Sequence, residues 1–142
     1  MILQLGPVYS MQIPSSSMEP TLPKGSFVQV ETTTPLLLET LEVGDIVAFR
    51  APVEREQILV KRVVGLPVDR LELRDKVLRR NGAEVEEAFT QFVDDEVFAT
   101  GDELAVRDQL APVTVPEAAV FVMGDNRDRS YDSRSFGAVS LR

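Results

Sequence analysis

Apolar and polar residues alternate over short runs along this chain, and glycine or proline separates most of the runs. Strict alternation is typical of strands that bury one face. The pattern predicts strands over residues 26–31, 45–50, 58–65, 70–73, 76–80 and 118–123. No long segment repeats with the 3.6-residue period of a helix. We therefore predict a mostly β protein, with a type I′ hairpin at Asn81-Gly82 because both residues tolerate positive φ.

The composition changes this picture by what it lacks. The 142 residues, about the size of one domain, include no histidine and no cysteine. This excludes a Ser-His-Asp triad, a Cys-His pair, a zinc site of the usual ligands and any disulfide. Acid–base chemistry near neutral pH must then come from lysine, aspartate, glutamate, tyrosine or a terminus.

The net charge of −8 is concentrated in one segment. Residues 84–108 contain nine acidic side chains and one basic side chain, whereas the rest of the chain is balanced. Without a basic stripe, nucleic acid is not an expected partner, and no polybasic anchor for anionic lipid is present. The run Asp94-Asp95-Glu96 lacks the spacing of a calcium loop, so we expect a solvated acidic surface and no metal site. No apolar run is long enough to span a bilayer, and we expect the chain as given to be soluble.

Three segments carry candidate chemistry. Residues 14–22 hold three consecutive serines, residues 58–64 hold Lys61 in a β-branched run, and residues 124–137 mix both charges between two glycines. Taken singly, they are a serine-rich turn, a lysine whose amine reaches water and a solvated turn. Taken together, they offer a serine nucleophile and a lysine base. A lysine that acts as a base near pH 8 needs its pKa lowered by ~2 units or more, which burial among apolar side chains can supply.

The residues also match a known family. The runs PSSSMEPTL (14–22), GDIVAFR (44–50), VKRVVGLPVDRLEL (60–73) and VMGDNRDRSYDSRSFG (122–137) closely resemble the boxes of bacterial type I signal peptidases, also called leader peptidases. The order and rough spacing match too, and RDKVLRRNGAEVEE (74–87) is similar to that family's hairpin. The resemblance implies a membrane-bound serine endopeptidase with a Ser/Lys dyad and no cofactor. Its partners would be preproteins, cut after Ala-X-Ala sites on the outer face of the cytoplasmic membrane.

The resemblance also implies roles for individual residues. Ser17 matches the nucleophile and Lys61 the general base. The Ser15 hydroxyl and the Ser17 amide match the oxyanion hole, and Ser130 matches the hydroxyl that orients the lysine. The charged residues that would support the site are Arg62, Asp125, Asp132 and Arg134. The residues that would line the substrate pocket are Ile13, Met18, Leu22, Leu59 and Val60. Residues 1–69 together with 117–142 would form the catalytic β core, and residues 70–116 an inserted non-catalytic segment.

The chain departs from the family pattern at several places. Only residues 1–13 precede the first box, where the family has membrane spans, and a closing strand after Val139 is expected to be missing. Val68 replaces the second glycine of the third box. Because a β-branched residue disfavours positive φ, we expect extended backbone there. Arg129 replaces an asparagine, and either lowers the pKa of the lysine or faces water.

Two other functions remain open on the sequence. A related Ser/Lys autoprotease, like the SOS-response repressors, would need an Ala-Gly bond to cut, and the chain contains none. A catalytically silent binding module with the same fold would present signal peptides without cleaving them. The presence of Ser15, Ser17, Lys61 and Ser130 favours the peptidase.

Overall fold

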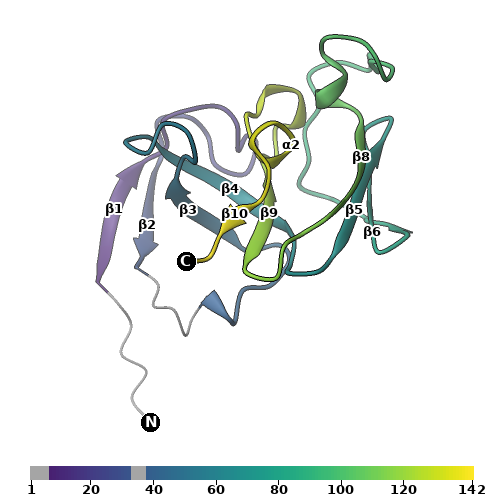
Figure 1. Ribbon diagram of the computed structural model, residues 1–142. Helices are drawn as coiled ribbons and strands as arrows, with labels where there is room; N and C mark the ends of the chain where they lie inside the picture. Colours follow the sequence, from purple (N-terminus) through teal and green to yellow (C-terminus); the bar gives the residue numbers. More distant parts are fainter. Residues whose placement is uncertain (1–6, 33–37) are drawn as a thin grey trace.

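A computed structural model describes residues 7–32 and 38–142, and its regular structure is dominated by three antiparallel sheets (Figure 1). The predicted mostly β fold is confirmed. One sheet is the ribbon β1-β2, a second has the strand order β10-β9-β4-β3, and a third has the order β7-β6-β5-β8. The strands are β1 (Val8–Gln12), β2 (Phe27–Glu31), β3 (Ile46–Arg50), β4 (Ile58–Gly65), β5 (Arg70–Arg74), β6 (Val77–Arg80), β7 (Ala83–Glu84), β8 (Leu110–Thr114), β9 (Ala119–Met123) and β10 (Val139–Ser140).

The helical elements with bounds inside the described ranges are short. These are η1 (Ala105–Arg107), η2 (Arg127–Arg129) and α2 (Ser133–Phe136). Within the described ranges, the structure contains no helix with the length and apolar character that crossing a bilayer requires.

Strand β4 is the central strand of the fold and is buried on both faces. It pairs with β3 on one side and β9 on the other. Val63 packs with Val120 and Val122 on one face, whereas Val60 packs with a separate cluster beneath the β1-β2 ribbon. A strand buried on both faces reads as a continuous apolar run, which is the pattern of residues 58–65.

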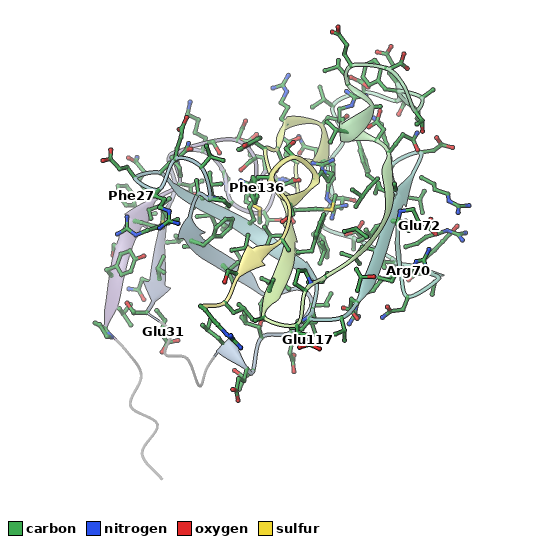
Figure 2. The ribbon with its side chains drawn as sticks, in the orientation of Figure 1. Phe27, Glu31, Arg70, Glu72, Glu117 and Phe136 are labelled. Atoms are coloured by element: carbon green, nitrogen blue, oxygen red, sulfur yellow. The ribbon has the colours of Figure 1, made fainter. Side chains whose placement is uncertain are left out.

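The third sheet lies within residues 70–116 but shares a core with the second. Val64 and Phe121 pack in one buried cluster with Leu71 and Leu78. Figure 2 shows Arg70 and Glu72 on this third sheet, at the opposite end of the molecule from Phe27 of β2. Apolar side chains from the predicted core and from the predicted insert therefore pack together. The division of the chain into a catalytic core and an inserted segment stays a prediction.

Two turns test the predictions about backbone conformation. The hairpin prediction is confirmed, with φ of 53° at Asn81 and 85° at Gly82 between β6 and β7. The expectation of extended backbone at Val68 is wrong, because its φ is 66°. Pro67 precedes Val68, and three hydrogen bonds close the turn: Val68 N to Val115 O (2.9 Å), Asp69 N to Leu66 O (3.1 Å) and Leu66 N to the Asp69 carboxylate (2.8 Å). These contacts outweigh the local steric cost at Val68.

Candidate active site

The predicted nucleophile lies in a tight turn directly after β1. Backbone hydrogen bonds from Glu19 N to Ser16 O (3.1 Å) and from Leu22 N to Met18 O (2.8 Å) close this turn. The Ser15 hydroxyl donates to Ser17 Oγ at 3.1 Å, and Ser17 N donates to Ser15 Oγ at 3.4 Å. Ser17 is buried, so its hydroxyl faces the protein interior rather than bulk water.

Lys61 meets this turn from the middle of β4. Its backbone pairs with Val47 of β3, and its side chain is 2 % exposed. Nζ lies 2.7 Å from Ser17 Oγ and 3.1 Å from Val60 O. The first distance is within the range that direct proton transfer between a hydroxyl and a base requires. The structure therefore brings together the two residues that the sequence placed 44 positions apart.

The surroundings of Lys61 favour the neutral amine. Burial lowers the pKa of Lys61 from 10.5 to about 8. The charge of Asp132 acts in the opposite direction, and the charge of Arg134 adds to the lowering. Desolvation is the largest cause because an ammonium group in an apolar site loses its hydration.

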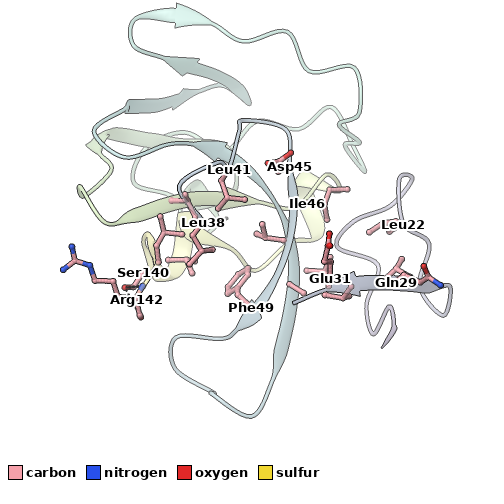
Figure 3. A pocket seen from close by; sticks show the side chains of 18 residues that line it. Leu22, Gln29, Glu31, Leu38, Leu41, Asp45, Ile46, Phe49, Ser140 and Arg142 are labelled. Carbon is pink, nitrogen blue, oxygen red and sulfur yellow. Dashed lines mark hydrogen bonds between the residues drawn. The ribbon is translucent and has the colours of Figure 1, made fainter. Parts of the chain in front are cut away.

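A small cavity of about 80 Å³ lies beside the Ser17–Lys61 pair. Four of the predicted pocket residues line it, namely Ile13, Met18, Leu59 and Val60. Leu22, the fifth, lies elsewhere: it packs near Val28 and lines a larger groove of about 700 Å³ between β2 and β3 (Figure 3). Leu22 follows the turn that carries Ser17, and its side chain packs against the cluster of Ile13, Met18 and Val60 without lining the small cavity.

Ser130 does not line this cavity and lies close to Gly124. Its hydroxyl donates to Asp132 Oδ2 at 2.7 Å and accepts from Gly124 N at 3.1 Å. Among the described residues, the hydrogen bonds of the Lys61 amine go to Ser17 and Val60, so the structure does not join Ser130 to Lys61 directly. Gly124 separates the two serines, since a Cβ there would lie 2.2 Å from Ser130 Oγ and 2.5 Å from Ser17 O.

Two buried ion pairs hold the loop that carries Ser130. Arg134 binds both carboxylate oxygens of Asp132 at 2.9 Å. Burial by itself would raise the pKa of Asp132, but the charge and hydrogen bonds of Arg134 and the bonds from Ser130 and Gly124 lower it. Arg62 forms a two-pronged pair with Asp125, at 2.8 and 2.6 Å. The four residues predicted to support the loop therefore form two pairs.

The structure also shows contacts that sequence reasoning missed. Asn126 donates from its side chain to Ser16 O and from its backbone to Ser17 O, each at 3.0 Å. Residue Gln91, from the acidic segment, forms a parallel bridge with Asn126, and buried Arg127 pairs with Glu87. The only sequence signal was the position of these residues in or near matched boxes. Arg129 is exposed, which is one of the two alternatives for this position.

The acidic segment is exposed at one point and buried at another. Asp94, Asp95 and Glu96, the run for which a solvated surface was expected, are exposed. Asp108 is fully buried, and Asp94 and Asp108 share the cations Lys76 and Arg107 with Asp128 of the loop that carries Ser130. Within residues 7–32 and 38–142, no group of three or more acidic side chains is arranged to hold a metal ion.

Comparison with known proteins places this chain in a family of peptidases. Residues 1–142 match the family described as "Signal peptidase, peptidase S26", and the chain belongs to that family. It is similar to "Signal peptidase I" of Bacillus licheniformis, with 39 % identity over 87 % of this chain and 64 % of the relative. It is also 33 % identical to "Thylakoidal processing peptidase 1, chloroplastic" of Arabidopsis thaliana, over 91 % of this chain and 37 % of that protein.

A solved structure supports the same assignment. The crystal structure of a signal peptidase I from Enterococcus faecalis matches with a TM-score of 0.57 and 33 % identity, over 71 % of this chain and 90 % of that chain. The chain thus spans less than two thirds of the length of the B. licheniformis relative, but most of the chain in the solved structure. These findings show the family, whereas the roles of individual residues rest on the geometry.

Proposed function

We propose that this chain is a serine endopeptidase that removes signal peptides from exported preproteins, with Ser17 as nucleophile and neutral Lys61 as general base. The observation that carries this proposal is the 2.7 Å contact between Lys61 Nζ and Ser17 Oγ in an apolar site. The pKa of Lys61, lowered to about 8, leaves a useful fraction of free amine near neutral pH. The names of the relatives, signal peptidases and thylakoidal processing peptidases, support the substrate class.

The geometry supports a two-step reaction. Neutral Lys61 accepts the proton of the Ser17 hydroxyl as Oγ forms a bond to the scissile carbonyl carbon. The Ser17 N–H and the Ser15 O–H donate to the resulting oxyanion. The Lys61 ammonium then protonates the leaving amine as the C–N bond breaks. Lys61 then takes a proton from a water molecule as the water oxygen bonds to the ester carbon, and the Lys61 ammonium returns that proton to Ser17 Oγ as the C–Oγ bond breaks.

The cavity supports specificity for small side chains. Its volume of about 80 Å³, between Ser17 and the apolar residues Ile13 and Met18, suits an alanine better than a long side chain. We therefore infer Ala-X-Ala cleavage sites, with the substrate in an extended conformation along the residues before Ser15 and before Lys61. Ser130 is assigned the lysine-orienting role, supported by its position across Gly124 from Ser17. Action at the outer face of the cytoplasmic membrane belongs to the same proposal.

Cleavage of a preprotein in detergent or lipid tests the proposal. Ser17→Ala and Lys61→Ala should each lower kcat/KM by about 10³-fold or more, because each removes one member of the dyad. Ser135→Ala, an exposed serine in the same chain, serves as the matched control and should retain full activity. Binding of the signal peptide by the unmodified chain without cleavage would show a binding module instead. Turnover close to that of the unmodified chain in either dyad variant would contradict the mechanism.

The pH dependence gives an independent measurement. Because only the neutral amine acts as base and the pKa of Lys61 is about 8, kcat/KM should rise about tenfold per pH unit below pH 8 and level off above it. A profile that is flat between pH 6 and 9 would exclude Lys61 as the base.

A further inference from the structure

Asn126 has an unusual combination of burial and hydrogen bonding. It is 1 % exposed, and its side-chain amino group donates to Ser16 O at 3.0 Å. Its Oδ1 is buried and has no hydrogen-bond partner among the described residues. A buried acceptor without a partner lowers stability, so packing does not explain the choice of asparagine. The explanation must come from the bond that the amino group makes.

That bond falls on the peptide group that supplies the oxyanion donor. Ser16 C=O and Ser17 N–H belong to the same planar trans peptide, so they point in opposite directions. A donor that fixes Ser16 O therefore fixes the direction of the Ser17 N–H. The hydrogen bond also polarises the peptide, which makes the N–H a stronger donor. The second bond, from Asn126 N to Ser17 O, holds the next peptide in the same way.

The backbone on both sides of Asn126 is itself fixed. Gln91 N donates to Asp125 O at 2.8 Å, and Arg127 N donates to Gln91 O at 2.9 Å. Buried Arg127 also donates to Gly124 O at 2.9 Å and pairs with Glu87. These contacts leave the Asn126 side chain little freedom to follow a displaced turn. Its amino group must also face Ser16 O, because a rotated amide would place two acceptors together.

We propose that Asn126 is a positioning residue for the oxyanion hole: it holds the Ser16–Ser17 peptide so that the Ser17 N–H points at the developing negative charge. This inference rests on the proposed function and deepens it. The residue touches the nucleophile's backbone and not the substrate, so its effect is on the transition state. Losing an oxyanion donor lowers kcat about 10²–10³-fold, and a misdirected donor should lose part of that.

The test compares Asn126→Ala and the nearly isosteric Asn126→Asp with the unmodified chain. Asn126→Ala should lower kcat about 10–30-fold with KM within twofold, and Asn126→Asp should lower it further because a carboxylate repels Ser16 O. Asn81→Ala in the β6–β7 turn is the control. It removes an amide that bonds Arg70 N and Asp69 in a different sheet, and it should leave kcat within twofold.

Two further readouts separate positioning from a general loss of structure. A signal-peptide boronate, which forms a tetrahedral adduct with a serine, should bind more weakly by the same factor as kcat, whereas the same peptide as its amide should bind unchanged. In Asn126→Ala, which adds no charge, the midpoint of the pH profile should stay at about 8. An unchanged kcat, an unchanged boronate affinity or a moved midpoint would each overturn the inference.

The two proposals fail differently. If the unmodified chain does not cleave signal peptides, the proposed function is wrong. Boronate affinity, which needs no turnover, still tests Asn126 in that case. If the unmodified chain cleaves and the Asn126 variants cleave equally well, only the positioning role is wrong.

Discussion

Two buried amines in this molecule have very different surroundings. Lys61 lies among apolar side chains, with a hydroxyl and a carbonyl oxygen as its hydrogen-bond partners. Lys76, just before β6, has a side chain that is 10 % exposed, and its Nζ lies within 4 Å of three carboxylates. Those carboxylates are Asp94 at 3.6 Å, Asp108 at 3.8 Å and Asp128 at 3.2 Å.

The difference shows what determines the role of a buried lysine. Three carboxylates give Lys76 ion-pair partners within 4 Å, whereas the burial of Lys61 among apolar neighbours lowers its pKa. Both side chains are largely shielded from water, and Lys61 is the more deeply buried of the two. The comparison predicts that removing the Lys61 amine and removing the Lys76 amine change the free energy of unfolding in opposite directions. It also predicts that a carboxylate placed beside Lys61 raises the pKa of that amine.

The largest effect is expected when the amine is removed from the apolar site. Below pH 8, Lys61 is protonated in both the folded and the unfolded chain, and the folded chain must hold that charge without hydration. Lys61→Met should therefore raise the free energy of unfolding by about 2–3 kcal/mol at pH 7, because the pKa is lowered from 10.5 to about 8.

The gain in stability from Lys61→Met should depend on pH. Stability of the unmodified chain rises between pH 8 and 10.5, where the unfolded state still binds the proton and the folded state does not. The advantage of Lys61→Met should therefore shrink across that window in denaturant titrations. A variant less stable than the unmodified chain at pH 7 would contradict the account of the apolar site.

Removing the amine from the acidic site should have the opposite sign. Lys76→Met leaves the buried carboxylates of Asp108 and Asp128 with Arg107 as the remaining cation nearby. We expect the free energy of unfolding to fall by about 2 kcal/mol, measured in denaturant at pH 7. The matched control is Lys24→Met at an exposed position, which should change it little. Unchanged stability in Lys76→Met would show that Arg107 alone neutralises the cluster.

A smaller effect is expected when the surroundings of Lys61 are made to resemble those of Lys76. Leu59→Asp places a carboxylate at the cavity beside Lys61 and should raise the pKa of the amine. The midpoint of the kcat/KM profile should move up by about one pH unit. Leu59→Asn, which has the same shape without the charge, should leave the midpoint near 8. Equal midpoints in the two variants would show that burial alone sets the basicity.

The sequence predicted the parts of the site that depend on local pattern and on matched boxes. The β-branched run at residues 58–65 placed Lys61 on a strand, and the boxes singled out Ser17. The type I′ turn followed from Asn81-Gly82 alone. These features were predictable because each depends on residues that are neighbours in the sequence or on a run that matches a box of the family.

The missed features depend on contacts between distant parts of the chain. Nothing near Asn126 indicates that its amide meets Ser16, 110 positions earlier. Likewise, the surplus of acid in residues 84–108 gave no sign that Asp108 is buried against Lys76 and Arg107. Val68 adopts a positive φ because Val115 holds its backbone, which overrides its local preference.

The close approach at Gly124 limits how this site can be altered. The turn that carries Ser17 and the loop that carries Ser130 meet there with space for a hydrogen atom and no more, since a methyl group would overlap both Ser17 O and Ser130 Oγ. Gly124 has no side chain to shorten, so no substitution at this position can adjust the spacing in small steps. Substitutions meant to change which side chain the proposed pocket accepts are therefore best confined to its lining, where Ile13, Met18 and Leu59 offer side chains of graded size.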